Sequence, residues 1–184
     1  DHSDHLLVTL SNPQRRNALS PAMYADLRAA LDRAAADDRF GAVVLTGANG
    51  YFCAGGDLNA LAERAALSQE ERRTRIEDLH ATIRAIRACP RPVIAAVEGG
   101  AAGAGFSIAL ACDLLVASED ASFAAAYVRV GLVPDGGLTA SLARRVPASL
   151  AARLCLTGDP IAAPVLAGMG VVTDLCASGQ ANAN

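Results

Sequence analysis

The stretch that decides the fold of this chain runs from Val93 to Ser107 and reads VIAAVEGGAAGAGFS. It opens with an apolar run, passes through glycines, and continues as an apolar segment of helical length to Cys112. This order predicts a buried strand, a tight turn and a helix. Because glycines carry no Cβ, N–H groups at the start of such a helix can face an anion, so the turn is a candidate anion or oxyanion site. Close packing of the strand against the helix is the alternative reason for the glycines.

Spacing and composition disfavour three other glycine motifs. A dinucleotide fingerprint needs glycines at relative positions one, three and six, which Gly100, Gly103 and Gly105 do not supply. A P-loop needs a lysine, and all 16 basic residues here are arginine. The segment from Gly105 to Ala109 nearly forms the nucleophile elbow of serine hydrolases. Those enzymes need a histidine after the serine, and the last histidine here is His80.

The composition is typical of a globular protein with one hydrophobic core. The 184 residues are 52% hydrophobic and 19% charged, and the net charge of −3 predicts no nucleic-acid surface. The 5 cysteines form no CxxC pair, which fits a reducing compartment and predicts no zinc site. The N-terminal residues lack the order of a signal peptide, and the longest uncharged run, 40–56, is shorter than the roughly 20 apolar residues that span a bilayer. We expect one cytoplasmic domain that binds neither nucleic acid nor membrane.

Alternating strand and helix patterns predict an α/β fold with a largely parallel sheet. Two helix starts are marked: Ser20 with Pro21 is an N-cap signal, and Ser68 with Glu71 forms a capping box. Within a single domain over 1–184, we expect a core over 6–175 and an unstructured tail over 176–184. Strands are predicted over 6–10, 42–46, 93–97, 114–117 and 122–125 and near 171. Helices are predicted over 21–36 and 69–88, from the central turn to 111, and over 138–145, 148–156 and 161–167.

Four segments together resemble the crotonase, or enoyl-CoA hydratase/isomerase, superfamily. They are residues 15–20 (RRNALS), 52–58 (FCAGGDL), 95–114 and 131–137 (GLVPDGG), in the family's order and at its usual spacings. The chain looks most like the branch containing oxepin-CoA hydrolase and epoxyphenylacetyl-CoA isomerase-like proteins. The resemblance implies a crotonase-like spiral of ββα units that binds an acyl-CoA thioester. It implies no metal, and coenzyme A only as part of the substrate.

The resemblance also implies which residues form the site. The family stabilises a thioester enolate with two backbone N–H groups, which here would be those of Gly56 and Ala104, and losing one such donor commonly costs roughly 3 to 4 kcal/mol of barrier. The resemblance places Arg15 and Arg16 near the nucleotide of CoA, and the alternative is that they are solvated loop charges. It places Asp57 along the pantetheine and thioester, and the alternative is that Asp57 is a plain helix cap. The acyl chain would meet side chains around residues 61–75 and Tyr127. The residues implied to contact the substrate or its CoA are Arg15, Arg16, Ala18, Ala54, Gly56, Asp57, Leu58, Gly103 and Tyr127.

The sequence departs from the family's hydratases at both of their glutamates, one of which activates water and the other protonates carbon. Ser107 and Tyr127 stand at these positions, which disfavours hydration by two carboxylates. Asp135 is the carboxylate left in a suitable loop and is the candidate acid/base, with a helix cap before Leu138 as the alternative. Ser107 is a candidate to orient a water, with packing as the alternative. We predict proton-shuttling isomerisation; the alternatives are hydration through a water held by other groups, and acyl-CoA binding without catalysis.

Members of the family continue past the last strand seen here with helices that close the pocket and build a trimer. This chain stops at Asn184. We therefore expect either that this chain is part of a longer one or that the C-terminal helical cap is missing. The resemblance implies a homotrimer or a dimer of trimers.

Overall fold

A five-stranded parallel sheet forms the centre of the protein. The structure, a computed structural model, describes residues 4–59 and 66–181. The strands lie in the order β1-β2-β3-β5-β8, and each neighbouring pair is parallel, with Val8 opposite Leu45 and Ala95 opposite Leu115. Their bounds are β1 (His5–Leu10), β2 (Ala42–Gly47), β3 (Val93–Val97), β5 (Leu114–Ser118) and β8 (Asp174–Cys176).

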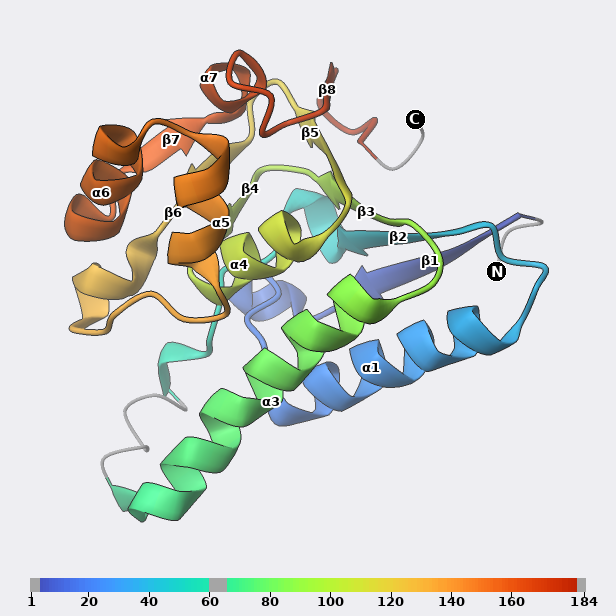
Figure 1. Ribbon diagram of the computed structural model, residues 1–184, viewed down its shortest axis with the longest axis horizontal. Coiled ribbons are helices and arrows are strands. Elements are labelled where there is room, and N and C mark those ends of the chain that lie inside the picture. Colours follow the sequence, from blue (N-terminus) through green and yellow to red (C-terminus); the bar gives the residue numbers. More distant parts are fainter. Residues whose placement is uncertain (1–3, 60–65, 182–184) are drawn as a thin grey trace.

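A second, three-stranded sheet lies beside the first (Figure 1). It consists of β4 (Gly100–Ala102), β6 (Ser122–Ala124) and β7 (Pro160–Ala162). Strand β4 is parallel to β6, and β6 is antiparallel to β7. Because β4 follows β3 after only two residues, the chain passes from one sheet to the other at the central glycine turn.

Helices α1 and α3 lie on one side of the five-stranded sheet, and α5 and α6 lie beside the second sheet (Figure 1). Helices α1 and α3 pack against each other, and the Arg28 guanidinium of α1 donates to the Asp78 carbonyl oxygen of α3 at 3.1 Å. Ser20 caps α1 by accepting from the Met23 N–H, and Ser68 and Glu71 form the predicted capping box of α3. The bounds are α1 (Pro21–Ala36), α3 (Gln69–Ala88), α4 (Ala104–Ala111), α5 (Leu138–Arg145), α6 (Ala148–Thr157) and α7 (Ala163–Ala167), with 3₁₀ helices η1 (Pro13–Arg15), η2 (Ala48–Gly50) and η4 (Ala126–Val130).

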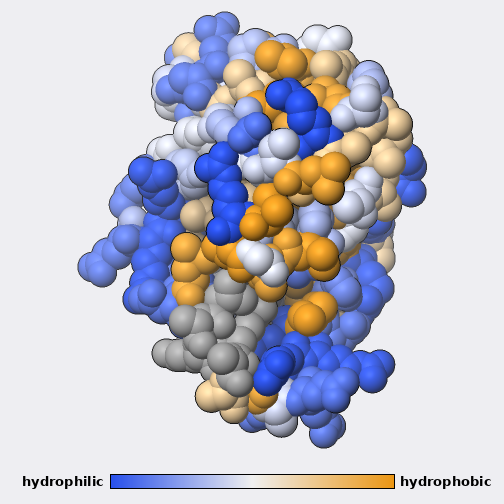
Figure 2. Space-filling view, turned by 90° about the vertical axis from the view of Figure 1, so that its left-hand side faces the viewer, coloured by the Kyte–Doolittle hydropathy of each residue, from blue (hydrophilic) through white to orange (hydrophobic). Residues whose placement is uncertain are grey.

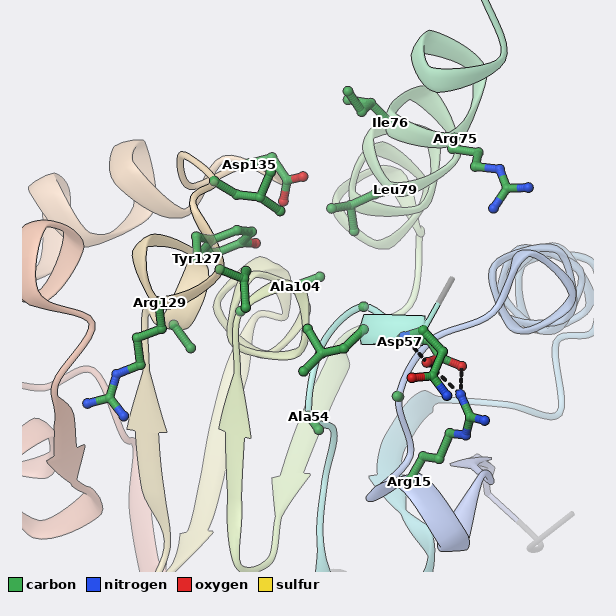
Figure 3. A pocket seen from close by; sticks show the side chains of 18 of the residues that line it. Arg15, Ala54, Asp57, Arg75, Ile76, Leu79, Ala104, Tyr127, Arg129 and Asp135 are labelled. Carbon is green, nitrogen blue, oxygen red and sulfur yellow. Dashed lines mark hydrogen bonds and ion pairs between the residues drawn. The ribbon is translucent and has the colours of Figure 1, made fainter. Parts of the chain in front are cut away.

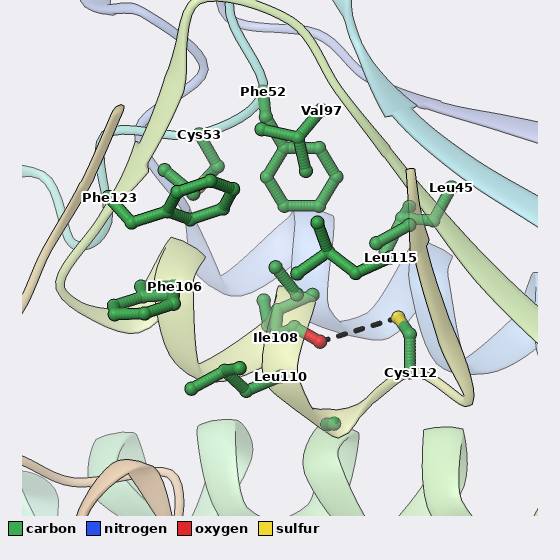
Figure 4. Packing of buried hydrophobic residues seen from close by; sticks show 14 of the residues in the cluster. Leu45, Phe52, Cys53, Val97, Phe106, Ile108, Leu110, Cys112, Leu115 and Phe123 are labelled. Atoms are coloured by element: carbon green, nitrogen blue, oxygen red, sulfur yellow. Dashed lines mark hydrogen bonds between the residues drawn. The ribbon is translucent and has the colours of Figure 1, made fainter. Parts of the chain in front are cut away.

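Helix α4 lies in the core and is buried along its whole length. Figure 4 shows its side chains packed among residues of both sheets. The rings of Phe106, on α4, and Phe123, on β6, lie 5.1 Å apart between centroids at a tilt of 45°. One continuous cluster of buried apolar residues extends from Leu6 to Val172. Helix α4, which begins directly after Gly103, is therefore held by packing contacts on all of its faces.

The sequence predicts most of these elements, including the parallel α/β architecture, and three expectations about single strands and helices are wrong. The expected strand near 171 is a loop, in which Val171 and Val172 are buried, and the last strand is β8. The segment 161–167 is not one helix, because β7 precedes α7. The central turn contains the strand β4. All three differences involve strands of three residues, which are too short to show an alternating pattern.

The expected unstructured tail is wrong for residues 176–181. Cys176 belongs to β8, and Ala181 is buried. The Glu98 carboxylate accepts the N–H of Gly179 at 3.0 Å and the N–H of Ala181 at 2.7 Å. A buried carboxylate on the turn between β3 and β4 therefore holds this segment. Residues 182–184 lie outside the described residues.

Within the ranges that the structure describes, no helix has both the length and the apolar character needed to cross a membrane.

Two core thiols should make the protein less stable in alkali. Burial raises the pKa of Cys53 and of Cys112 to about 12, whereas a thiol in an unfolded chain ionises at about pH 8.5. Above about pH 9 the unfolded chain loses protons that the folded chain keeps. The free energy of unfolding should then fall by about 1.4 kcal/mol per pH unit for each thiol. Urea unfolding at about pH 8.5 and pH 10 measures this.

The variant Cys112→Ala provides the control for this prediction. It removes one of the two thiols, so its stability should fall less steeply over the same pH interval. A free energy of unfolding that stays constant over this interval in the unmodified protein would contradict the burial of these thiols.

Candidate active site

A cavity of about 540 Å³ opens beside the N-terminus of α4. Figure 3 looks into it, with Asp135 and Tyr127 on one side, Asp57 and Arg15 on the other, and Ala104 between them. The structure thus brings together residues from four separate parts of the sequence. The predicted site residues that line the cavity are Arg15, Ala18, Ala54, Gly56, Asp57, Leu58, Gly103, Ala104, Tyr127 and Asp135.

Main-chain hydrogen bonds hold two glycine-rich turns side by side at this cavity. Cys53 forms a parallel bridge with Ala101, and the Ala102 N–H donates to the Cys53 carbonyl oxygen at 2.9 Å. The Gly103 N–H donates to the Ala124 carbonyl oxygen at 2.9 Å, which fixes the end of β4 against β6. The segment after Cys53 therefore passes the start of α4.

The N–H groups of Gly56 and Ala104 are available to a ligand at the cavity wall. Among residues 4–59 and 66–181, neither donates to another backbone or side-chain atom. Ala104 is the first residue of α4, where the helix dipole adds a partial positive charge. Such unpaired donors favour an anionic or carbonyl oxygen. Their convergence on one oxygen remains a prediction.

Two positions in these turns require glycine because the backbones approach closely. Gly55 has φ of 92°, and a Cβ there would lie 2.7 Å from the Ala102 carbonyl oxygen and 3.2 Å from the Ala104 nitrogen. A Cβ at Gly105 would lie 2.4 Å from the Cys53 carbonyl oxygen. Close approach of the two turns therefore explains glycine at both positions, and the same packing brings the N–H groups of Gly56 and Ala104 to the cavity.

An ion pair crosses one side of the cavity. The Arg15 guanidinium donates to both carboxylate oxygens of Asp57, at 2.6 and 2.5 Å. Asp57 also accepts the N–H of Asn59 at 2.9 Å, so it fixes the start of its own segment, as a cap would. Arg16 does not line the cavity. Its guanidinium lies over the ring of Tyr51, 5.4 Å from the centroid.

A hydrogen-bonded group of polar residues forms the opposite side. The Ser107 hydroxyl does not line the cavity itself. It lies 2.9 Å from the Tyr127 hydroxyl and 3.1 Å from the Asp135 carbonyl oxygen. Burial, and next the negative charge of Asp135, raise the pKa of Tyr127 well above its usual value, so the phenol stays protonated. The Asp135 Oδ1 atom is buried and has no hydrogen-bond partner among the described residues. An unpaired carboxylate oxygen beside a cavity can accept a proton.

Sequence reasoning missed much of the apolar wall. Tyr24 of α1 and Ile76 and Leu79 of α3 line the cavity, together with Leu132 after η4. The capping signals predicted where α1 and α3 begin, but a cap does not show which face of a helix reaches a cavity. Arg75 also lines the cavity, within the range expected to meet the acyl chain, whereas residues 61–65 of that range lie outside the described residues.

The mouth of the cavity is apolar. Leu58, Val130 and Leu132 line it and are 61%, 41% and 40% exposed. Figure 2 shows apolar side chains gathered across the middle of one face, with hydrophilic side chains around them. A ligand that enters here passes apolar surface before it reaches the N–H groups.

The fold is that of solved enoyl-CoA hydratases. A crystal structure of an enoyl-CoA hydratase from Polaromonas sp. JS666 matches with a TM-score of 0.97 at 46% identity, covering 100% of this chain and 71% of that one. The chain also matches the model of the enoyl-CoA hydratase/isomerase family over residues 3–184, and it belongs to that family. The resemblance found in the sequence is thereby confirmed.

Two relatives are named for different reactions. A probable enoyl-CoA hydratase of Rhodobacter capsulatus is 42% identical over 166 residues, which are 90% of this chain and 63% of that protein. A 1,2-epoxyphenylacetyl-CoA isomerase of Escherichia coli is 35% identical over 159 residues, 86% of this chain and 61% of that protein. This chain therefore spans less than two thirds of the length of both relatives.

Alanine should lower stability at Gly55 and leave it nearly unchanged at Gly56. At Gly55 the positive φ and the contact with Ala102 leave no room for a Cβ, so Gly55→Ala should lower the free energy of unfolding by roughly 1 to 3 kcal/mol. Nothing lies within 4 Å of a Cβ at Gly56, so Gly56→Ala should change it by less than about 0.5 kcal/mol. Urea unfolding of the two variants compares them. Equal stabilities would contradict the described packing of the turns.

Proposed function

We propose that this protein acts on an acyl-CoA thioester by stabilising its enolate and moving a proton within the acyl group. The observation that carries the proposal is the pair of unpaired N–H groups, of Gly56 and Ala104, at the wall of a cavity that also contains Asp135. In an apolar cavity such donors stabilise a developing oxyanion more strongly than water does. Family membership supports the substrate class.

Proton transfer in this site needs only one carboxylate. The Asp135 carboxylate takes a proton from the carbon next to the thioester, and the electrons of that C–H bond move into the enolate, whose oxygen faces Gly56 and Ala104. The protonated Asp135 then returns the proton to another carbon as the double bond shifts. A carboxyl group that first accepts and later donates a proton fits this sequence. The products and reactants of the step therefore balance without a further reagent.

Isomerisation fits the site better than hydration. Hydration needs a base for water and an acid for carbon, and neither Ser107 nor Tyr127 is a carboxylate. Ser107 does not line the cavity, which disfavours a role in orienting water, and the raised pKa of Tyr127 keeps the phenol from acting as a base. The relative that is a 1,2-epoxyphenylacetyl-CoA isomerase supports this choice, and the hydratase relatives keep hydration as the alternative. Acyl-CoA binding without catalysis is the second alternative.

The CoA part of the substrate is proposed to lie along the side that carries Ala18, Ala54, Asp57 and Leu58. Arg15 faces this side, but its charge is already paired with Asp57. A phosphate at this position would therefore compete with a carboxylate for the same guanidinium. The absence of another cofactor, the cytoplasmic location and the trimer or dimer of trimers remain predictions from the sequence.

Proton exchange tests the proposal without knowledge of the natural acyl group. Incubation of butyryl-CoA with the protein in D₂O should introduce deuterium next to the thioester, measured by mass spectrometry. Asp135→Asn should slow this exchange at least roughly 100-fold, because general-base catalysis contributes about that much or more. Binding of butyryl-CoA should change little, because the two N–H groups remain.

Asp38→Asn is the matched control, because Asp38 is an exposed aspartate that pairs with Arg91 at 2.5 Å, and neither residue lines the cavity. It should exchange protons at the unmodified rate. Exchange that persists in Asp135→Asn would remove Asp135 from the mechanism. Butyryl-CoA binding without exchange in the unmodified protein would favour the non-catalytic alternative.

A further inference from the structure

We infer that Ser107 is a positioning residue, which fixes the turn of Asp135 and, together with the Tyr127 hydroxyl, holds the carboxylate of Asp135 in place. This inference rests on the proposed function, because it assigns how the base of that reaction is held. Ser107 and Tyr127 stand where the resemblance places the glutamates of the hydratases. The structure gives the pair a different task.

The Ser107 hydroxyl contacts three parts of the site. It lies 3.1 Å from the Asp135 carbonyl oxygen and 3.5 Å from the carbonyl oxygen of Gly103, the residue before α4. It also lies 2.9 Å from the Tyr127 hydroxyl, a contact in which either oxygen can donate. One buried hydroxyl therefore joins the start of α4, the turn of Asp135 and the Tyr127 phenol.

The contacts of Ser107 extend to the Asp135 side chain through Tyr127. Burial, the charge of Asp135 and a hydrogen bond with its carboxylate all raise the pKa of Tyr127, so the protonated phenol lies between Ser107 and the carboxylate. The hydroxyl pair therefore holds both the backbone and the side chain of the proposed base.

Steric contact makes a small residue necessary at position 107. Ser107 is 1% exposed, and a Cβ placed on Gly136 would lie 2.8 Å from the Ser107 Cβ and 3.2 Å from its Oγ. The turn that follows Asp135 therefore rests directly on Ser107. A glutamate at 107 would need the space that this turn fills. We infer that a carboxylate at 107 and the observed Asp135 turn exclude each other, which leaves the site with one base.

Substitutions at Ser107 and Tyr127 test the inference through the exchange of butyryl-CoA protons in D₂O. Ser107→Ala removes the hydroxyl without adding volume, and it should slow exchange roughly tenfold while the dissociation constant of butyryl-CoA changes less than about twofold. Tyr127→Phe should have a similar effect. Because the hydroxyls act as one chain, the double variant should be about as slow as the slower single variant.

Ser141→Ala is the matched control, since Ser141 is a buried serine outside the cavity lining that accepts from the Arg87 guanidinium at 3.0 Å. It should exchange at the unmodified rate. Ser107→Glu should displace the turn and lose exchange as completely as Asp135→Asn. Thermal unfolding of each variant shows whether it folds, and Tyr127→Phe tests the chain of hydroxyls if Ser107→Ala does not fold.

The results separate this inference from the proposed function. Exchange within twofold of the unmodified rate in both single variants would overturn the positioning role, and so would losses that multiply to roughly 100-fold in the double variant. A dissociation constant that rises in step with the loss of rate would also overturn it, because Ser107 would then act in binding. Loss in Asp135→Asn together with normal exchange in Ser107→Ala would leave the proposed function intact. Exchange that survives Asp135→Asn would overturn the proposed function itself.

Discussion

The hydrogen bond from the Ala102 N–H to the Cys53 carbonyl oxygen, at 2.9 Å, is the contact on which the site depends. It joins two segments that lie almost fifty residues apart in the sequence, and it lies directly beside the glycines that start α4. Because Gly55 and Gly105 have no side chains, the two backbones can approach closely on either side of this bond. The N–H groups of Gly56 and Ala104 are placed by this main-chain contact rather than by any side chain.

The complete burial of α4 connects the core to the chemistry. Its sequence, AGFSIALA, is apolar on every side, so the helix can be enclosed by both sheets and cannot serve as a surface helix. Ser107 is the one polar side chain in this helix, and a buried hydroxyl without a partner would be costly. It finds its partners in Tyr127 and in the carbonyl oxygen of Asp135. The same burial that stabilises the helix therefore determines how the side of the cavity with the carboxylate is built.

The sequence alone was sufficient to predict those structural features that have a short-range sequence pattern. The caps at Ser20 and Ser68, the long strands and the glycine turns all have short-range signatures, and the segments that carry the resemblance lead to most of the cavity lining. Features set by tertiary packing could not be found in this way. Nothing local shows that Arg16 turns toward Tyr51, that Glu98 binds the segment after β8, or that Leu79 of α3 forms a wall of the cavity. Each of these depends on which distant residue the fold brings near.

The central claim is that the N–H groups of Gly56 and Ala104 hold one thioester oxygen between them. The most direct test is a crystal structure of the protein with bound acetoacetyl-CoA. The account predicts that the thioester oxygen lies within about 3.1 Å of both nitrogens, with the acyl group on the side of Asp135. A thioester oxygen that contacts only one of the two nitrogens, or that lies elsewhere in the cavity, would contradict it.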